Sequence, residues 1–455
     1  MRSLFKSMRL MCVGTLLCVV PSLVWGEIHK DRMVVLISLD GFPAYALEDP
    51  RLPIPTIRKL AREGAIATSM QPINPTVTWP NHTALVTGVD ASEHDLLFNG
   101  LLVRTPSGAQ PSVEPWRDKE VLVHAPTVYD LAYRAGLTTA QVDWVAIYGA
   151  KTITWKFPEL PDPEGPVEQT MIADGTVTAD QLQKFEDSSQ AWQDEIWTDA
   201  AVRILKQHKP NLLLFHLLTG DDTNHEYGPM SHASFTAMGL LDSYVKRIVD
   251  ALQEEGVMRR ATVIVVSDHG FRKIRHKLHP NVLLRETGLI TGDHKHLRGD
   301  AWVASTGGTA MVYVSDPARK EELIPKLRRI LANREGIDRV YEPNSFAELG
   351  LPLASASDQG PDLVLSALPD YSFANEAEGS YVTGIDEGGT HGYLNTDPKM
   401  QAIFVAWGAG IASGVRLDKI SNLDVAPTIA AILGIDMKTA KGHALKGILK
   451  PHVRE

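Results

Sequence analysis

The sequence predicts an α/β sandwich with a mostly parallel central sheet, helices on both of its faces and a small α/β insert. Its first indication is three apolar runs of strand length, which suit strands buried on both faces of a parallel sheet. The second is the set of helical patterns between these runs, because strands that alternate with helices favour parallel pairing. The runs are 33–39, 211–218 and 261–267.

In the first half of the chain, a helix is expected at 57–64, where Gly64 closes it, followed by a short strand at 65–69. Residues 93–119 are rich in Pro and Gly and are predicted to be irregular. Thr127 is a candidate cap for a helix that ends at Gly136. A strand should follow near 138–144, and residues 151–190 show no clear period, which predicts a long surface excursion.

In the second half, amphipathic helices are expected at 191–207 and 235–255. Residues 276–359 read as a small α/β insert, with strands at 309–314 and 336–341 around a basic helix at 317–333. Core strands are expected to return at 362–366 and 401–406, before a helix at 424–433 that Gly434 ends. Residues 27–275 and 360–455 therefore form the two parts of one core.

The N-terminal segment predicts a signal peptide over residues 1–26. Arg2, Lys6 and Arg9 precede an apolar run at 10–20 that is too short for a membrane span. Cleavage would place the protein outside the cytoplasm, either secreted or periplasmic, and a retained interfacial anchor or a lipidated Cys18 are the alternatives. Cys12 and Cys18 are the only cysteines. The mature chain would therefore have no disulfide, thiolate ligand or cysteine nucleophile.

Composition and charge exclude some classes of protein. The 455 residues are 44% hydrophobic and 22% charged, which is typical of a soluble globular protein with ample core. The formal net charge is −10, and loss of the three basic residues of the leader would make the remainder more acidic. Duplex nucleic acid is therefore not expected as a partner. The sequence indicates no oligomeric state.

An aspartate follows each of the three buried runs. In open α/β sheets ligands bind at the carboxyl ends of the strands, so Asp40, Asp221 and Asp268 should converge on one edge. Aspartate is also a common turn residue, but two of the three have a histidine nearby. These are His225, four residues after Asp221, and His269, next to Asp268.

Carboxylate and imidazole groups without sulfur suit Zn²⁺, with Mn²⁺ or Fe as alternatives. With His391, which lies in the glycine-rich segment 388–393, the candidates suffice for two metal sites. Asp222 competes with Asp221 as a ligand, and His391 alone could be an ordinary loop residue. Three further histidines are interpreted as structural, and two pairs as exposed loop residues or a separate metal pair. They are His82, His94 and His216, and the pairs His276 with His279 and His294 with His296.

The segment 75–82 (PTVTWPNH) predicts a helix N-terminus, with Pro80 suited to the first helical position and Gly88 to the C-cap. Thr78 would then lie where the helix dipole and free N–H groups favour an anion. A hydroxyl is a weak nucleophile at neutral pH. Two metals near Thr78 could activate it, whereas the simpler interpretation is an N-cap threonine.

Taken together, these segments resemble the nucleotide pyrophosphatase/phosphodiesterase family of the alkaline phosphatase superfamily. The matching motifs occur in family order and span most of the mature chain, which makes them specific as a set. They are LDGF at 39–42, PTVTWPNH at 75–82, LVTG at 85–88, DDTNH at 221–225 with YGP at 227–229, SDHG at 267–270 and GTHG at 389–392.

The resemblance implies an alkaline-phosphatase-like fold, in which residues 27–275 and 360–455 form the catalytic core, and a site with two zinc ions. One zinc would be bound by Asp40, Asp268 and His269, with Thr78 on it, and the other by Asp221, His225 and His391. Thr78 would be the nucleophile. Asn99, in LFNG at 97–100, resembles the family asparagine that binds a phosphoryl oxygen.

The resemblance also implies the substrate, with two departures from the family pattern. Trp79 takes the place of the aromatic residue that stacks a nucleotide base, but the opposing tyrosine is missing from 143–147, where Tyr148 could replace it. Packing in the core is the alternative role for Trp79. Lys151 lacks the arginine partner with which monoesterase relatives bind a dianionic phosphate, which favours diesters.

We therefore expect a secreted, metal-dependent hydrolase of phosphodiester or pyrophosphate bonds that acts through a phospho-threonine on Thr78. Its substrate would be a small phosphodiester or nucleotide. The alternatives are a phosphomonoesterase, a C–P hydrolase similar to phosphonoacetate hydrolase, and a secreted binding protein without catalysis on the same fold. A sulfatase ranks last, because Thr78 cannot become formylglycine.

Overall fold

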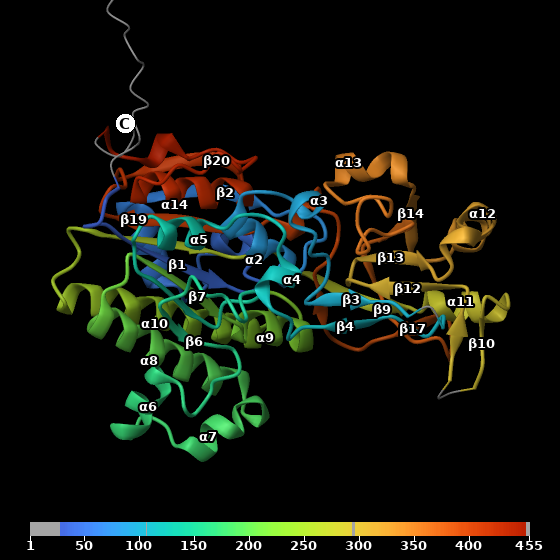
Figure 1. The fold of residues 1–455 in the computed structure, drawn as a ribbon, viewed down its shortest axis with the longest axis horizontal. Helices are drawn as coiled ribbons and strands as arrows, with labels where there is room; N and C mark the ends of the chain where they lie inside the picture. The colour runs from blue at the N-terminus through green and yellow to red at the C-terminus, as the bar shows by residue number, and fades with distance from the viewer. Residues whose placement is uncertain (1–27, 106, 294–295, 452–455) are drawn as a thin grey trace, which may run out of the picture.

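The computed structural model describes residues 28–105, 107–293 and 296–451. Eight strands form its central sheet: β1 (Met33–Leu39), β2 (Ala65–Gln71), β5 (Thr139–Val142), β6 (Trp155–Phe157), β7 (Leu212–Leu217), β8 (Ala261–Val266), β19 (Phe404–Gly408) and β20 (Val415–Ser421). They lie in the order β20-β2-β19-β8-β1-β7-β5-β6 (Figure 1). Only β19 is antiparallel to its neighbours in this sheet. The predicted mostly parallel sheet is confirmed.

Helices cover both faces of this sheet. Successive residues of a strand point to opposite faces, so the buried side chains of the central strands contribute to a core on each face. One face packs against α1 (Pro55–Glu63), α8 (Gln190–His208) and α10 (His232–Glu254), and the other against α2 (Thr78–Thr87), α5 (Val128–Arg134) and α14 (Val425–Leu433). Val35 and Ile37 belong to the first core, and Val34 and Leu36 to the second. The central strands β1, β7 and β8 are therefore buried at every position.

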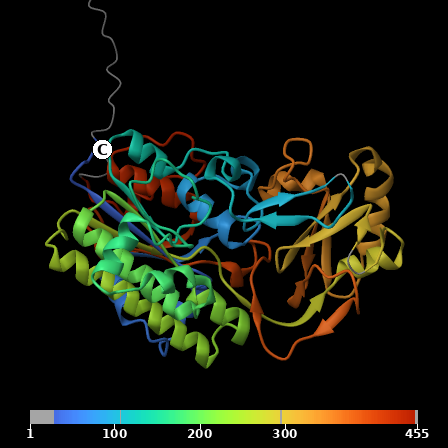
Figure 2. The same cartoon turned by 60° about the horizontal axis from the view of Figure 1, so that its bottom comes forward.

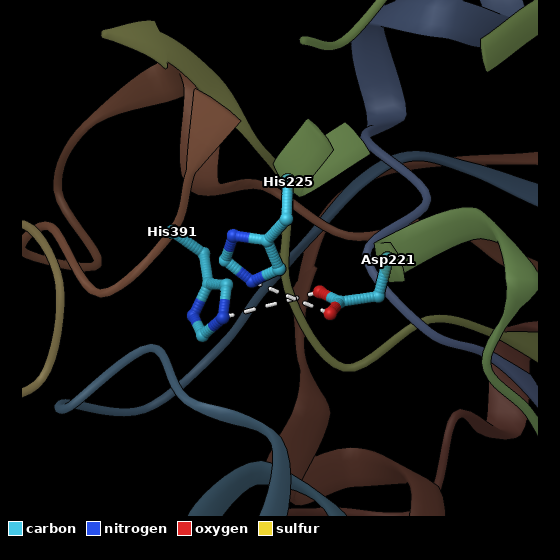
Figure 3. Close-up of side chains that lie close together, drawn as sticks. All are labelled: Asp221, His225 and His391. Carbon is cyan, nitrogen blue, oxygen red and sulfur yellow. Dashed lines mark ion pairs between the residues drawn. The ribbon is translucent and has the colours of Figure 1, made fainter. Parts of the chain in front are cut away.

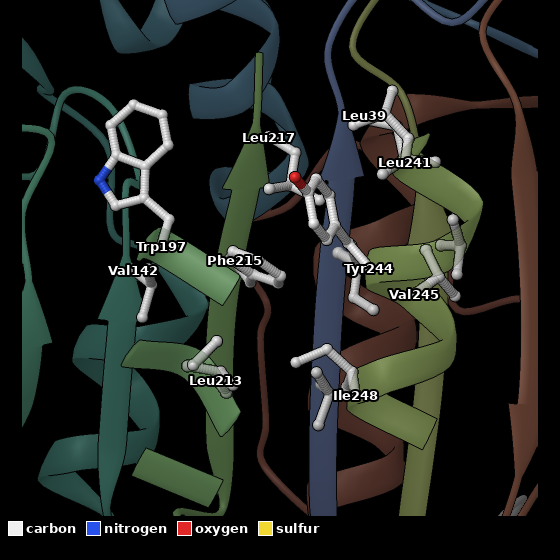
Figure 4. Packing of buried hydrophobic residues seen from close by; sticks show 14 of the residues in the cluster. Leu39, Val142, Trp197, Leu213, Phe215, Leu217, Leu241, Tyr244, Val245 and Ile248 are labelled. Carbon is white, nitrogen blue, oxygen red and sulfur yellow. The ribbon is translucent and has the colours of Figure 1, made fainter. Parts of the chain in front are cut away.

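Figure 4 shows the first of these cores, where β7 packs under α8 and α10. Phe215 and Leu217 lie beneath Trp197 of α8 and Tyr244 of α10, and both are fully buried. Burial of such side chains contributes about 1.5–3 kcal/mol each. This packing holds the carboxyl ends of the central strands in a rigid frame.

A second, smaller sheet lies beside the central one (Figures 1 and 2). Its strands β12 (Ala301–Ser305), β13 (Thr309–Val314), β15 (Leu363–Ala367) and β14 (Ile337–Tyr341) are antiparallel in that order. The expected return to the central sheet at 362–366 is therefore wrong. The apolar run of β15 is instead buried between β13 and β14, so strands from both sides of the boundary expected near residue 359 share one sheet. The division at 276 and 359 itself stays a prediction.

The remaining helices and strands of the described residues include three further small sheets, one of four strands and two of two strands. They are α3 (Ala91–His94), β3 (Leu101–Val103), β4 (Ser112–Glu114), α4 (Lys119–Leu122), α6 (Pro166–Ala173), α7 (Ala179–Gln183), α9 (Thr219–Tyr227), β9 (Arg272–Leu278), α11 (Pro280–Glu286), β10 (Ile290–Thr291), β11 (Arg298–Gly299), α12 (Lys320–Leu331), α13 (Phe346–Leu349), β16 (Asp370–Phe373), β17 (Val382–Gly384) and β18 (Gly389–Thr390). Short strands and helices occur in the stretch 93–119, which was expected to be irregular, and in 151–190, which was expected to be a long surface excursion without a clear period. The latter contains α6, α7 and the edge strand β6, and Val167, Met171 and Leu182 bury their side chains in the core.

The starts of helices α5 and α2 can be compared with the helix boundaries that the sequence predicts. The side chain of Thr127 accepts a hydrogen bond from the Asp130 N–H, as its expected capping role requires. Helix α2 begins at Thr78, so Pro80 is its third residue rather than its first, and Gly88 closes it with φ 68°. The predicted signal peptide and His294 lie outside the described residues. Within the described ranges, no helix has the length and apolar character needed to cross a membrane.

Candidate metal and phosphoryl-transfer site

The three strand-end aspartates lie at the carboxyl edge of the central sheet. Asp40 directly follows β1, Asp268 is the second residue after the adjacent strand β8, and both are fully buried. Asp221 lies in the first turn of α9, after β7, on the other side of β1. Ligand atoms of Asp40, Asp221 and His269 lie within 4.8 Å of one another. The predicted convergence on one edge is confirmed.

One group of candidate ligands consists of Asp221, His225 and His391, whose ligand atoms also lie within 4.8 Å of one another. The Nε2 atom of His225 is 3.4 Å from Asp221 Oδ2, and that of His391 is 3.9 Å from Asp221 Oδ1 (Figure 3). Asp221 and His225 are one helical turn apart on α9, which places both on one face. His391 enters from the glycine-rich segment. There Gly392, with φ 80°, lies so close to the chain that a Cβ would be 1.6 Å from the Thr306 oxygen.

The second group contains Asp40, His269 and again Asp221, which therefore lies between the two groups. His269 Nε2 is 3.5 Å from Asp40 Oδ1 and 3.1 Å from Asp268 Oδ2. The other oxygen of Asp268 accepts hydrogen bonds from the backbone N–H groups of Gly41 and His269. These contacts leave Asp268 Oδ2 facing the same space as Asp40 Oδ1.

The three histidines share one orientation. In each, Nδ1 faces a backbone carbonyl: Gly389 for His225, Gly270 for His269 and Thr76 for His391, at 3.1, 3.2 and 2.9 Å. A carbonyl only accepts, so Nδ1 carries the proton and Nε2 presents its lone pair to the carboxylates. Metal-ligating histidines are oriented in this way.

The electrostatics of the site favour a bound cation. Burial, with the charge of Asp221, raises the pKa of Asp40 to about 6, although His216 acts in the opposite direction. Burial and the charges of Asp40 and Asp221 also raise the pKa of Asp268 well above its usual value. Burial lowers the pKa of His391 to about 4, which keeps its imidazole neutral as a ligand must be. Divalent cations would relieve the repulsion between these carboxylates.

Unpaired buried atoms give an independent test of this fit. Asp40 Oδ1, Asp221 Oδ1, Asp268 Oδ2 and His269 Nε2 are buried and have no hydrogen-bond partner within the described part of the chain. A buried polar atom without a partner costs about 1–3 kcal/mol, and these four are acceptors or lone-pair donors in one place. The donor set of carboxylate oxygens and imidazole nitrogens therefore fits Zn²⁺ or a similar divalent ion. Asp222 belongs to neither group and is exposed.

Thr78 is 6% exposed and is the first residue of α2. The helix start is joined to the metal-ligand candidates at two points. The Thr76 carbonyl accepts a hydrogen bond from His391 Nδ1, and His82, one turn into the helix, lies 3.7 Å from Asp268 Oδ2. These contacts bring the positive end of the helix dipole to the carboxylates.

Asn99 and Trp79 differ in exposure. Asn99 is exposed, and its amide oxygen accepts the Trp79 N–H at 3.0 Å, which leaves its NH₂ group to donate to a ligand. Trp79 is only 6% exposed and packs against Leu96 and Leu122. The exposed aromatic ring beside it is Trp116, 43% exposed, with the ring centroids 6.3 Å apart.

Sequence reasoning missed Trp116 and also the part played by two histidines interpreted as structural. His216 Nε2 lies 2.9 Å from Asp40 Oδ2, and His82 contacts both Asp268 and the start of α2. The position of His216, a polar residue inside the apolar run 211–218, was the one feature of the sequence that could have indicated its role. His279 pairs with Glu376 and belongs to neither of the described ligand groups.

The sequence is similar to that of a known family and of several of its members. Residues 34–394 match the family model of type I phosphodiesterase/nucleotide pyrophosphatase. The chain is 25% identical over 412 residues to ectonucleotide pyrophosphatase/phosphodiesterase family member 1 of Homo sapiens, covering 88% of this chain and 40% of that protein. It is 23% identical over 459 residues to family member 7 of Mus musculus, covering 98% of this chain and 92% of that protein.

Solved structures give the same fold. Human ectonucleotide pyrophosphatase/phosphodiesterase 5 superposes with a TM-score of 0.70 at 18% identity, over 92% of this chain and all of the other. An inactive threonine-to-alanine variant of the murine protein, in complex with AMP, gives a TM-score of 0.69 at 17% identity, with the same coverage. The alkaline-phosphatase-like fold that the motifs imply is confirmed.

Proposed function

The chain belongs to the type I phosphodiesterase/nucleotide pyrophosphatase family, and from this premise we propose that it hydrolyses phosphodiester or pyrophosphate bonds with Thr78 as the nucleophile. The observation that carries the proposal is the junction between the start of α2 and the ligand groups. Thr78 lies two residues from Thr76, whose carbonyl orients His391, and four from His82, which contacts Asp268. These contacts bring the start of α2, where Thr78 lies, next to His391 and Asp268, which supports the proposed role of the hydroxyl.

Two divalent ions, for which zinc is the best candidate, would occupy the two ligand groups. Asp40, Asp268 and His269 would hold one ion together with Thr78, and Asp221, His225 and His391 the other. The unpaired oxygens of Asp40 and Asp268 support the first set, and the common orientation of the histidines supports both. Such ions stabilise the charge on the attacking and leaving oxygens of an in-line displacement.

The reaction would proceed in two displacements at phosphorus, in which residues of the chain have different roles. Thr78 Oγ attacks phosphorus, its proton goes to solvent, and the bond from phosphorus to the leaving oxygen breaks. The NH₂ group of Asn99 and the backbone N–H of Thr78, the first residue of α2, donate to the phosphoryl oxygens, where charge develops. Water then attacks the phospho-threonine and releases a phosphate monoester, with Thr78 regained.

The substrate is proposed to be a small phosphodiester or nucleotide, in agreement with the AMP bound to the murine neighbour. Lys151 is exposed and has no ion-pair partner among the described residues, and no arginine follows it at 153. This lack of a second cation for a dianionic phosphate supports diesters over monoesters. The basic and apolar pattern of the leader supports action outside the cytoplasm, secreted or periplasmic, as the names of the ectonucleotide relatives suggest for those proteins.

One assay tests the proposal and separates its rivals. Bis-p-nitrophenyl phosphate, p-nitrophenyl phosphate and phosphonoacetate are compared with the wild-type protein and with Thr78→Ala. The diester should be turned over fastest, and Thr78→Ala should lose at least about a thousandfold in kcat, since removal of a catalytic nucleophile has effects of this size or larger. Zinc content should stay similar in the variant.

Other outcomes would point elsewhere. A dominant rate on the monoester or on phosphonoacetate would replace the diester assignment by the corresponding alternative. Equal slow rates for wild type and Thr78→Ala on all three compounds, in a folded protein, would indicate a binding protein without catalysis.

A further inference from the structure

His216 is the next-to-last residue of β7 and is fully buried. Its two ring nitrogens face two acceptors on different strands. Nε2 lies 2.9 Å from Asp40 Oδ2, after β1, and Nδ1 lies 3.0 Å from the carbonyl oxygen and 3.2 Å from Oδ2 of Asp143, after β5. Both partners accept, so both nitrogens donate. The ring thus bridges Asp143 to a candidate metal ligand.

The backbone around this bridge is adapted to it. Asp143 has φ 54°, a left-handed conformation that residues other than glycine adopt rarely, and this turns its carbonyl and carboxylate toward β7. Its carboxylate oxygens have no hydrogen-bond partner among the described residues, and Oδ2 lies nearest to the His216 ring. Such strain persists where the surroundings demand it and is often found at functional sites. A leucine would fit the apolar pattern of β7 better than a histidine with these needs.

The hydrogen bond from His216 fixes the orientation of the Asp40 carboxylate. His216 occupies its Oδ2, while Oδ1 has no hydrogen-bond partner among the described residues and lies 3.5 Å from His269 Nε2. Asp268 shows the same division, with one oxygen held and the other facing the site. There, however, backbone N–H groups do the holding. The orientation of Asp40 therefore depends on a side chain that can be replaced.

We propose that His216 is a positioning residue for metal binding, which holds the carboxylate of Asp40 so that Oδ1 faces the ion, with Asp143 securing the ring. The inference rests on the metal-dependent function proposed above. Groups that orient a metal ligand typically change metal affinity by about 10–100-fold when removed.

Two substitutions at this one position separate positioning from packing. The amide nitrogen of glutamine reaches the place of Nε2, so His216→Gln keeps a donor for Asp40 and loses the contact with Asp143. Asparagine reaches only the place of Nδ1, so His216→Asn keeps a donor for Asp143 and loses the one for Asp40. Zinc affinity is measured by competition with a chromogenic chelator, zinc content by elemental analysis, and folding by the melting temperature of the metal-free protein.

His216→Asn should bind the more weakly held zinc about 10–100-fold less tightly, and its zinc content should fall from two toward one per chain. His216→Gln should lose less than about threefold. Equal zinc affinity in the two variants, whether both unchanged or both reduced, would overturn the inference even if both melt at lower temperature. If the wild-type protein binds no zinc, the metal-dependent function proposed above is wrong. If the wild type binds zinc but the two variants bind it equally, only the role of His216 is wrong.

Discussion

At the scale of single residues, two tryptophans near Thr78 differ in exposure. The sequence indicates Trp79, next to Thr78 in the chain, as the residue that stacks a base, but Trp116 is the more exposed of the two. Trp79 is buried, and its backbone N–H is bound to Asn99. Trp116 is exposed and is held near the same residues, because a Cβ on Gly100 would lie 2.7 Å from Pro115 Cα. An exposed flat ring there suits a nucleoside base better than a buried one does. The substrate-binding role of Trp79 stays a prediction, and Trp116 is a competitor for it.

The prediction at this scale compares Trp79→Ala with Trp116→Ala on two substrates that share a leaving group, p-nitrophenyl thymidine 5′-phosphate and methyl p-nitrophenyl phosphate. Loss of base stacking costs about 1–3 kcal/mol. Trp116→Ala should therefore reduce kcat/KM about tenfold to hundredfold on the nucleotide diester and spare the methyl diester, with the melting temperature unchanged.

Trp79→Ala should instead reduce both rates together and destabilise the fold by about 3–5 kcal/mol, as expected for a buried tryptophan. A selective loss on the nucleotide diester in Trp79→Ala, with Trp116→Ala unaffected, would restore the role expected from the sequence.

At the scale of elements, two buried aspartates hold the starts of two helices. Asp194 of α8 accepts the N–H groups of Leu218 and Thr219, where α9 begins. Asp242 of α10 accepts those of Thr56 and Ile57 in α1. The two arrangements are alike, but only α9 carries candidate ligands, Asp221 and His225. Helix α9 is therefore aligned with the site by a side chain from a neighbouring helix.

This similarity provides a matched pair of variants. Asp194→Ala and Asp242→Ala each leave two N–H groups at a helix start without an acceptor, which costs about 1–3 kcal/mol for each buried group. Both should lower the free energy of unfolding in urea by similar amounts. Only Asp194→Ala should also reduce zinc content and kcat, since it alone loosens ligand-bearing α9. Equal zinc content in the two variants would show that α9 needs no such support.

At the scale of the whole molecule, the fold brings carboxylates together from three strand ends that are 181 and 47 residues apart in the chain, at Asp40, Asp221 and Asp268. Their mutual repulsion opposes folding. Burial, together with this repulsion, raises the pKa values of Asp40 and Asp268. An ion that binds the native state and not the unfolded chain stabilises the native state by mass action, by about 4 kcal/mol at a thousand times its Kd. The metal should therefore contribute to stability as well as to catalysis.

Removal of the metal tests this directly. Wild-type protein should contain close to two zinc ions per chain, and dialysis against a chelator should lower its melting temperature, with recovery on addition of zinc. His391→Ala should contain less zinc and show a smaller shift. Asp222→Asn, next to Asp221 but exposed and outside both ligand groups, is the control and should behave as wild type. A melting temperature insensitive to the chelator in wild-type protein would contradict the prediction.

The sequence predicted most of the central sheet and most of the candidate ligands, for reasons that particular residues make clear. The predominantly apolar runs at β1, β7 and β8 suit strands buried on both faces, and a ligand just after each then lies on one edge. It failed at β15, whose apolar run suits any buried strand. The choice between the central sheet and the smaller one depends on pairing with β13 and β14, which no local pattern encodes.

Local patterns by themselves thus determined the buried strands, a helix start within two residues of Thr78 and the residue types at the site, because these depend on neighbours within a few positions. Only the tertiary structure decided that Asp221 lies between the two ligand groups, that Trp79 is buried behind Trp116, and that His216 holds Asp40. The last contact joins residues 176 positions apart. It exists because β1 and β7 pair in a register that sets His216 beside Ser38, two residues before Asp40, and that register is set by the packing of the whole sheet.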